Sequence, residues 1–242
     1  AEKYAPDLDS ICYVIGTEVP IPGGETETID TLQVTSPDRL DRTIETHIQA
    51  FKEKNLQAAL SRIVSVVVQP GVDFSHTAVT QYSKSSAKKL VDQLSKYKDI
   101  AFEAHSTDYQ QTTGLANLVA DHHLFLKVGP ELTFALREAL FLLAKIEDEL
   151  FKDKASNLIQ VVFKTMDNNP KDWINYYHGS IDEQQFLKHY SYSDRIRYYW
   201  NHPDVNSAIN KMIKNLDNVD IPEFVISQFF GIATNEQNNE TA

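Results

Sequence analysis

A strand–loop–helix pattern that occurs twice between residues 100 and 140 constrains the fold of this chain most strongly. The apolar runs Ile100–Ala104 and Leu124–Val128 each end in a polar or Gly-Pro turn and lead into a helical pattern. Two earlier runs, Ile11–Ile15 and Ile63–Gln69, have the same character, and the second is β-branched and almost continuously apolar. These four runs predict a parallel sheet built from four β/α units with right-handed crossovers.

The intervening segments carry helix signals. Ser36 is the expected N-cap of a helix that starts with Pro37, and Ser86 is the expected cap of the next. Two more helices are expected near Thr113–Asp121 and over Glu131–Leu150. From Lys154 the pattern is helical only, over residues 154–168, 171–177, 194–200, 203–217 and 222–230.

The change of pattern predicts three parts. Residues 1–153 form an α/β part, residues 154–230 a helical extension packed on it, and residues 231–242 a polar, disordered tail. Four β/α units do not close a barrel, which needs eight. The residue pattern therefore leaves open an open sheet or the C-terminal half of a barrel.

Charge and composition exclude several classes of protein. An excess of 34 acidic over 23 basic residues gives a net charge of −11, which argues against a nucleic-acid partner. The sequence has no apolar run long enough for a membrane span, and residues 1–10 do not resemble a signal peptide. The single cysteine, Cys12, lies in an apolar run, so we expect a buried thiol in a cytoplasmic protein.

Polar residues collect at the predicted carboxyl ends of the strands, where α/β proteins bind ligands. Glu103 and His105 share a strand face, and Lys127 interrupts the next apolar run. A buried lysine needs a carboxylate nearby, and Glu103 is the nearest candidate. The pair has two interpretations, a structural ion pair or the floor of a sugar-phosphate pocket. The candidate pocket residues are Glu18, Glu103, His105, Asp108, Lys127 and Gly129.

Phosphate-binding signals are incomplete. Gly129 offers a backbone N–H before the helix that begins near Pro130, but Glu131 places a negative charge in its first turn. The loop Ser106–Asp108 has no glycine, and the sequence has neither a Gly-x4-Gly-Lys-Ser/Thr loop nor a Gly-x-Ser-x-Gly elbow. Kinase and serine-hydrolase chemistry are therefore not expected.

An aromatic and basic segment, Tyr190–Trp200, has two interpretations. Its side chains either pack a helix against the rest of the fold or form a subunit interface, since Tyr, Trp and Arg dominate binding hot spots. The candidate interface residues are Arg195, Arg197, Tyr198 and Trp200.

Five motifs together resemble one family. They are YVIGTEVPIPGGE (13–25), VVVQPGV (66–72), FEAHSTDYQ (102–110), LKVGPELTFALREAL (126–140) and YSDRIRYYW (192–200). They are similar to the Z-type, non-catalytic subunit of D-tagatose-1,6-bisphosphate aldolase. The resemblance implies a (β/α)8 barrel of the TIM type, of which this chain carries the C-terminal four β/α units plus extra C-terminal helices.

The same resemblance implies a function and a partner. Such a subunit is chaperone-like and supports the stability and activity of a catalytic class II aldolase in galactitol and N-acetylgalactosamine breakdown. It implies no catalysis and no cofactor in this chain, with zinc in the catalytic subunit. The alternatives are a sugar-phosphate-binding enzyme of the class II aldolase type, or the tagatose-6-phosphate kinase that some relatives are labelled. Self-association of this chain is a further expectation.

One residue fits the zinc ligands of class II aldolases in position. His105 follows a strand, as such a ligand would, but Gln69-Pro70-Gly71 offers no ligand after the preceding strand. His122 and His123 come before the last predicted strand, at its amino end. Because catalytic zinc usually has three protein ligands, no metal site is predicted in this chain.

Overall fold

The chain divides into two compact units, Ala1–Glu131 and Leu132–Ala242. A computed structural model describes residues 1–16, 32–217 and 219–230. The sequence placed the boundary after residue 153, whereas the structure places it near the start of helix α4 (Pro130–Phe151). The reason is packing, because α4 contributes Leu140 and Ala144 to the core of the helices that follow it.

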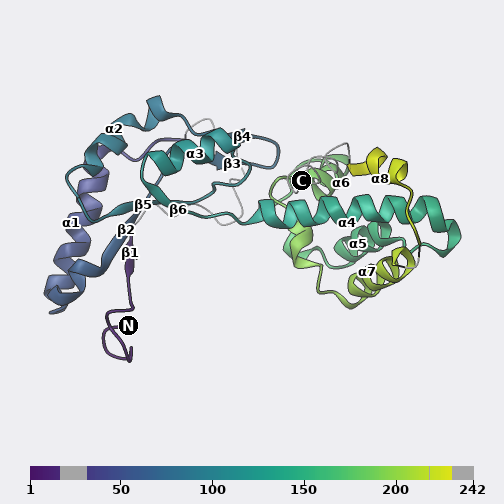
Figure 1. The fold of residues 1–242 in the computed structure, drawn as a ribbon, viewed down its shortest axis with the longest axis horizontal. Helices are drawn as coiled ribbons and strands as arrows, with labels where there is room; N and C mark the ends of the chain where they lie inside the picture. The colour runs from purple at the N-terminus through teal and green to yellow at the C-terminus, as the bar shows by residue number, and fades with distance from the viewer. Residues whose placement is uncertain (17–31, 218, 231–242) are drawn as a thin grey trace, which may run out of the picture. The chain divides into compact units, whose positions relative to one another are not determined.

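The first unit, within the described residues, combines a parallel sheet with three α-helices and a 3-10 helix, and Figure 1 shows how these elements are arranged. Its elements are β1 (Tyr13–Ile15), α1 (Pro37–Glu53), a 3-10 helix (Gln57–Arg62), β2 (Ile63–Val68), β3 (Asp73–Phe74), β4 (Val79–Thr80), α2 (Lys84–Leu94), β5 (Ala101–Ala104), α3 (Thr112–Ala120) and β6 (His123–Leu126). All four predicted strands are present and shorter than predicted. Strand β6 also begins one residue earlier than predicted, so His123 lies in the strand rather than before it. The small antiparallel pair β3–β4 was not predicted.

The four strands follow one another across the sheet in chain order, β1-β2-β5-β6, and all pairs are parallel. Val67 lies opposite Glu103, and Glu103 lies opposite Phe125. Within the described residues the sheet does not close, so β1 and β6 are its edges. The finding is an α/β fold with a parallel sheet.

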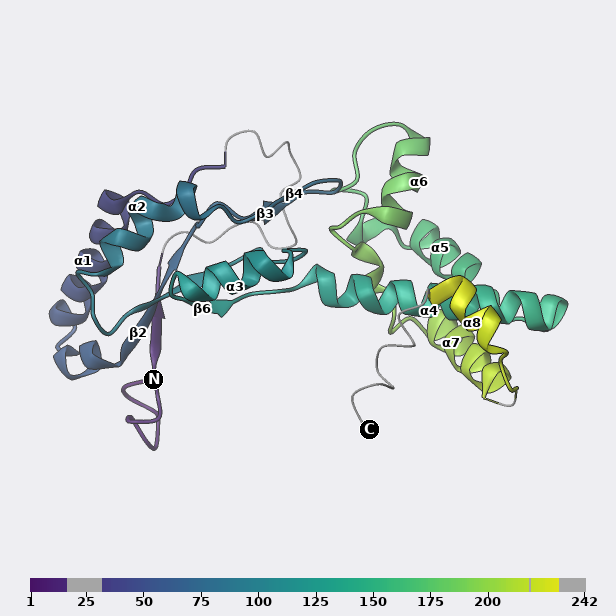
Figure 2. The ribbon, with the colours of Figure 1, turned by 45° about the horizontal axis from the view of Figure 1, so that its top comes forward.

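One face of this sheet carries the core. Val66 and Phe102 pack with Leu40 and Ile44 of α1 and with Leu90 of α2. Leu118 of α3 forms a neighbouring cluster against which Leu126 of β6 packs. Helices α1 and α2 lie side by side in both views (Figures 1 and 2). All three helices therefore pack against the face that carries Val66, Phe102 and Leu126.

Local signals set the helix starts. The Ser36 hydroxyl accepts a hydrogen bond from the Arg39 N–H, and Pro37 opens α1 as predicted. The cap of α2 is Ser83 rather than the predicted Ser86, whose own N–H donates to the Ser83 hydroxyl. Both serines lie in one polar run, which the sequence pattern alone does not resolve.

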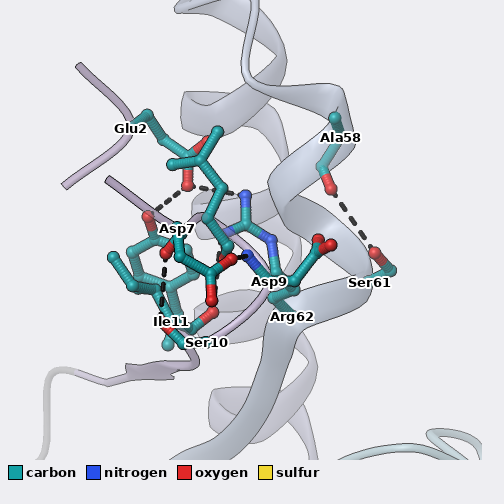
Figure 3. Close-up of polar contacts among 10 residues, drawn as sticks. Glu2, Asp7, Asp9, Ser10, Ile11, Ala58, Ser61 and Arg62 are labelled. Atoms are coloured by element: carbon teal, nitrogen blue, oxygen red, sulfur yellow. Dashed lines mark hydrogen bonds and ion pairs between the residues drawn. The ribbon is translucent and has the colours of Figure 1, made fainter. Parts of the chain in front are cut away.

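Arg62 attaches the segment before β1 to the end of the 3-10 helix that precedes β2 (Figure 3). Its guanidinium donates to the Glu2 carboxylate at 2.7 Å and to the Leu8 carbonyl at 2.6 Å. The Tyr13 hydroxyl also donates to Glu2. Cys12 lies just before β1 and is exposed, so the prediction of a buried thiol was wrong.

The second unit is helical. After α4 come a 3-10 helix (Lys152–Lys154), α5 (Leu158–Asn168), a 3-10 helix (Pro170–Asp172), α6 (Ile181–Tyr190), a 3-10 helix (Arg195–Tyr198), α7 (Pro203–Leu216) and α8 (Glu223–Phe230). Its core joins α4, α5 and α7 around Val162, Met166, Ile196 and Met212. The predicted tail, residues 231–242, lies outside the described residues.

Prediction and structure differ at three places in this unit. Residues 171–177 hold only the end of a 3-10 helix and turns, because Pro170 starts a single short turn. Helix α6 was missed, although Ser180 and Glu183 form a capping box in which each side chain bonds the other residue's N–H. The predicted helix at 194–200 is a 3-10 helix of four residues.

None of the helices within the described ranges combines the length and the apolar character that a membrane span requires.

Candidate functional site at the carboxyl ends of β5 and β6

Parallel pairing brings the polar residues of two strands together. Strand β5 ends at Ala104 and β6 at Leu126, and the Lys127 N–H donates to the Ala104 carbonyl at 3.0 Å. His105 and Lys127 therefore leave the sheet at the same edge, beside Glu103. This is the edge at which parallel α/β sheets bind ligands.

Glu103 is the centre of the cluster. One of its oxygens, Oε1, accepts from Nζ of Lys127 at 2.6 Å and from Nε2 of His105 at 2.8 Å. The Glu103 side chain is 4% exposed and the Lys127 side chain is 57% exposed. The predicted contact is confirmed, but Lys127 is not the buried charge that its apolar neighbours suggested. It lies at the open end of an edge strand.

The two hydrogen-bond donors decide the charge of Glu103. Burial raises the pKa of this carboxyl, but hydrogen bonds from Lys127 and His105 lower it by more, and the net effect is a lowered pKa. Glu103 is therefore a carboxylate at neutral pH. Because Nε2 of His105 donates to it, Nδ1 is the ring nitrogen left to interact with other groups.

The loop after β5 is held by side-chain hydrogen bonds. The Gln110 amide donates to the Thr80 carbonyl and accepts from the Tyr82 N–H, while Gln81 does the same with Tyr109 and Gln111. The sequence analysis did not identify Gln81 or Gln110, because a single glutamine in a sequence does not indicate that its side chain will bond to distant backbone groups. These hydrogen bonds tie the loop after β5 to the segment after β4.

The structure brings the candidate pocket residues Asp108 and Gly129 together, and they form a hydrogen bond with each other. Oδ1 of Asp108 accepts from the N–H groups of Gly129 and Glu131 at 2.8 and 2.9 Å. The Glu131 carboxylate in turn accepts from the Tyr109 N–H at 2.7 Å. The N–H groups of Gly129 and Glu131, at the start of α4, are therefore occupied by a carboxylate of the chain itself.

Glu18 lies outside the described residues. Nowhere within residues 1–16, 32–217 and 219–230 do three or more His, Cys, Asp or Glu side chains gather in a way that could hold a metal ion. His105 has a carboxylate partner of the kind that orients metal-binding histidines, but within the described residues it belongs to no group of three potential ligands.

The four candidate interface residues differ in exposure. Arg195 is buried, with its guanidinium carbon 3.5 Å from the centre of the Tyr176 ring. Trp200 and Arg197 are half-buried, and Tyr198 is 49% exposed. The contacts of Arg195 are those of a core residue, whereas Tyr198 can reach a partner.

Comparison with known proteins places the chain in a family. The family model described as "D-tagatose-1,6-bisphosphate aldolase subunit GatZ/KbaZ-like" matches residues 1–242. The chain belongs to the GatZ/KbaZ-like family. GatZ subunits of D-tagatose-1,6-bisphosphate aldolase from Salmonella typhimurium and Salmonella heidelberg are similar to this GatZ/KbaZ-like chain, with 47% identity over 223 residues.

These relatives are longer. The match covers 92% of this GatZ/KbaZ-like chain but 52% of each Salmonella GatZ, so the chain spans about half the length of the curated relatives it matches. A crystal structure described as a probable tagatose 6 phosphate kinase from Sinorhizobium meliloti 1021 is also similar. It shares 45% identity with a TM-score of 0.82, and the match covers 90% of this chain and 54% of that one.

Exposure of Lys127 sets the expected cost of removing it from this GatZ/KbaZ-like chain. Breaking a fully buried pair costs about 3–5 kcal/mol, but here the ammonium is largely solvated and His105 still donates to Glu103. We expect Lys127→Met to lower the free energy of unfolding by about 1–3 kcal/mol, because Glu103 stays buried with one donor fewer. Urea unfolding followed by circular dichroism measures this.

Two further variants complete that test. Lys127→Met combined with Glu103→Leu should recover most of the loss, because no buried carboxylate remains. Lys88→Met removes an exposed ion pair with Asp92 on α2 and should change stability by less than about 0.5 kcal/mol. Additive effects of the two single changes at 103 and 127 would show that the contact has no energetic coupling.

Proposed function

We propose that this protein acts as the accessory, non-catalytic subunit of a class II tagatose-1,6-bisphosphate aldolase, in the cytoplasm, in galactitol and N-acetylgalactosamine breakdown. Membership of the GatZ/KbaZ-like family, whose relatives are named as aldolase subunits, is the observation that carries the proposal. In this role the chain stabilises a catalytic subunit, and the zinc belongs to that partner.

We infer further that the sheet supplies four β/α units of a (β/α)8 barrel. The unreversed strand order and the three helices on one face support this, since an open doubly wound sheet has helices on both faces. Val14 on β1 and Phe125 on β6 are large apolar side chains exposed at the two edges. Hydrogen exchange tests the barrel. If the longer relatives close a barrel, the amides of their β6 should exchange more slowly than the β6 amides of this chain, which lie at the edge of the sheet. Equally fast exchange of the β6 amides in both proteins would contradict the barrel.

The alternative function is an enzyme that acts on a sugar phosphate. The cluster of Glu103, His105 and Lys127 favours a ligand site of some kind, and a similar structure is described as a probable kinase. Against kinase chemistry, the sequence has no glycine-rich phosphate loop and the first turn of α4 carries Asp108 and Glu131 carboxylates.

Co-expression with a catalytic class II aldolase subunit tests the accessory role. We expect the chain to raise the soluble yield, thermal midpoint and activity of the catalytic subunit, and to show no cleavage of tagatose 1,6-bisphosphate alone, with or without added zinc. Turnover by the chain alone that a chelator abolishes would establish the enzyme instead. No effect on the catalytic subunit would overturn the accessory role.

A variant pair locates the contact. Tyr198→Ala removes an exposed residue of the segment Tyr190–Trp200, and Phe224→Ala removes an exposed aromatic side chain of the same unit outside that segment, on α8. If the segment binds the catalytic subunit, only the change at Tyr198 should reduce the gain in thermal midpoint. Equal effects of both variants would exclude Tyr198 as a specific contact.

A further inference from the structure

The cluster at the ends of β5 and β6 has polar atoms that the fold does not use. Oε1 of Glu103 binds both His105 and Lys127, while Oε2 has no hydrogen-bond partner among the described residues, although the side chain is 4% exposed. Within the same residues, Nδ1 of His105 also makes no hydrogen bond. Oε2 is not fully buried, so this free acceptor is open to a ligand that donates to it.

An aromatic side chain lies beside these atoms. Phe125 is opposite Glu103 in the register of β5 and β6, and Lys127 follows Phe125 by two residues. Paired residues of neighbouring strands share a face, and the contact between Lys127 and Glu103 shows that Lys127 is on it too. Phe125 is 42% exposed. The face thus offers a ring surface next to an acceptor, an imidazole and an ammonium.

The charge at this edge disfavours a phosphate. Lys127 is balanced by Glu103. At the nearby start of α4 the Asp108 carboxylate accepts from the Glu131 N–H, and the Glu131 carboxylate accepts from the Tyr109 N–H. A phosphate near Lys127 would meet these three carboxylates, and the N–H groups of Gly129 and Glu131 are already bound to Asp108. A ligand with hydroxyl groups and no charge meets no such repulsion.

We propose that Glu103, His105, Lys127 and Phe125 bind an uncharged polyhydroxylated ligand, a free sugar or alditol, in preference to its phosphate. One hydroxyl donates to Oε2 of Glu103, a second donates to Nδ1 of His105, and the Lys127 ammonium donates to a hydroxyl oxygen. The Phe125 ring packs against the C–H face of the ligand. Because the site is partly open, affinity lies in the millimolar range. The proposal is independent of the accessory role.

D-tagatose and D-tagatose 6-phosphate form a matched pair of probes. We expect D-tagatose to shift the amide NMR signals around residues 103–105 and 125–127 of the full chain at lower concentration than the 6-phosphate does. Lys127→Met should weaken the binding of D-tagatose about tenfold and Phe125→Leu about threefold. Inorganic phosphate should leave these signals in place.

Two controls keep the test decisive. Lys88→Met and Val119→Ala change exposed residues on α2 and α3 and should leave binding unchanged. A dispersed amide spectrum shows for each variant that it folds. If Lys127→Met does not fold, Phe125→Leu still tests the site, because it keeps an apolar side chain at this position. Tighter binding of the 6-phosphate, or D-tagatose binding unaffected by both site variants, would overturn the proposal. Neither outcome would bear on rescue of the catalytic subunit.

Discussion

Replacing Arg137 by methionine is expected to lower the free energy of unfolding of the second unit by about 3–5 kcal/mol. Arg137 is 3% exposed, donates to the His189 carbonyl at 2.6 Å and lies 3.6 Å from Oδ1 of the buried Asp194. Burial raises the pKa of Asp194 and Arg137 lowers it, so Arg137 is its principal counter-charge. Without Arg137, Asp194 must be buried with less compensation or take up a proton.

The two tryptophans, Trp173 and Trp200, both belong to this unit, so tryptophan fluorescence during urea unfolding reports on it alone. The double variant Arg137→Met/Asp194→Asn should be more stable than Arg137→Met, because the buried side chain at position 194 is then uncharged. Lys145→Met, an exposed change on α4, should cost less than about 0.5 kcal/mol. A loss at Arg137 as small as at Lys145 would mean that the pair contributes nothing.

The first unit is expected to lose about 3 kcal/mol of stability as the pH falls from about 6.5 to about 4. His123 is fully buried between Phe102 and Tyr82, and burial lowers its pKa from 6.5 to about 4. Its Nδ1–H donates to the Leu118 carbonyl, and its Nε2 has no partner among the described residues. A second proton would therefore be buried without an acceptor.

The sign of this pH dependence follows from the number of protons that the folded and unfolded states bind. In this pH interval the unfolded state binds a proton at residue 123 that the folded state does not, so protonation favours unfolding. His123→Phe should remove about 3 kcal/mol of this pH dependence, as measured by urea unfolding at several pH values with NMR signals of unit 1 amides. Val119→Ala, an exposed change on α3 without a titratable group, should leave the slope unchanged. An unchanged slope in His123→Phe would assign the pH dependence to other groups.

The sequence predicted the parts of the fold that depend on short, strong patterns. The β-branched run of β2 and the Ser36–Pro37 start of α1 appear where the pattern placed them. The predicted burial of Cys12 was wrong because an apolar run does not show where strand pairing begins. Strand β1 begins at Tyr13, one residue after Cys12, which is exposed. Helix α6 was missed despite its capping box, because Ile181, Phe186 and Tyr190 are exposed and no buried apolar stripe marks it.

The candidate site was predicted in part. Strand alternation brought Glu103 and His105 to one face, and the charge of Lys127 identified its partner correctly. Sequence could not show that Lys127 follows an edge strand and is solvated, because strand order is a long-range property. Nor could it show that Asp108 accepts the Gly129 N–H, since that depends on how two loops meet.

The open edges of the sheet have a consequence for handling the chain in isolation. Along β1 and β6, backbone groups that face away from the sheet have no strand partner among the described residues, and Val14, Leu124 and Phe125 are exposed beside them. Such edges are templates for intermolecular strand addition and hence for aggregation. Lys127 stands at the end of β6 as a charged gatekeeper, so replacing it removes both an ion pair and a barrier to precipitation.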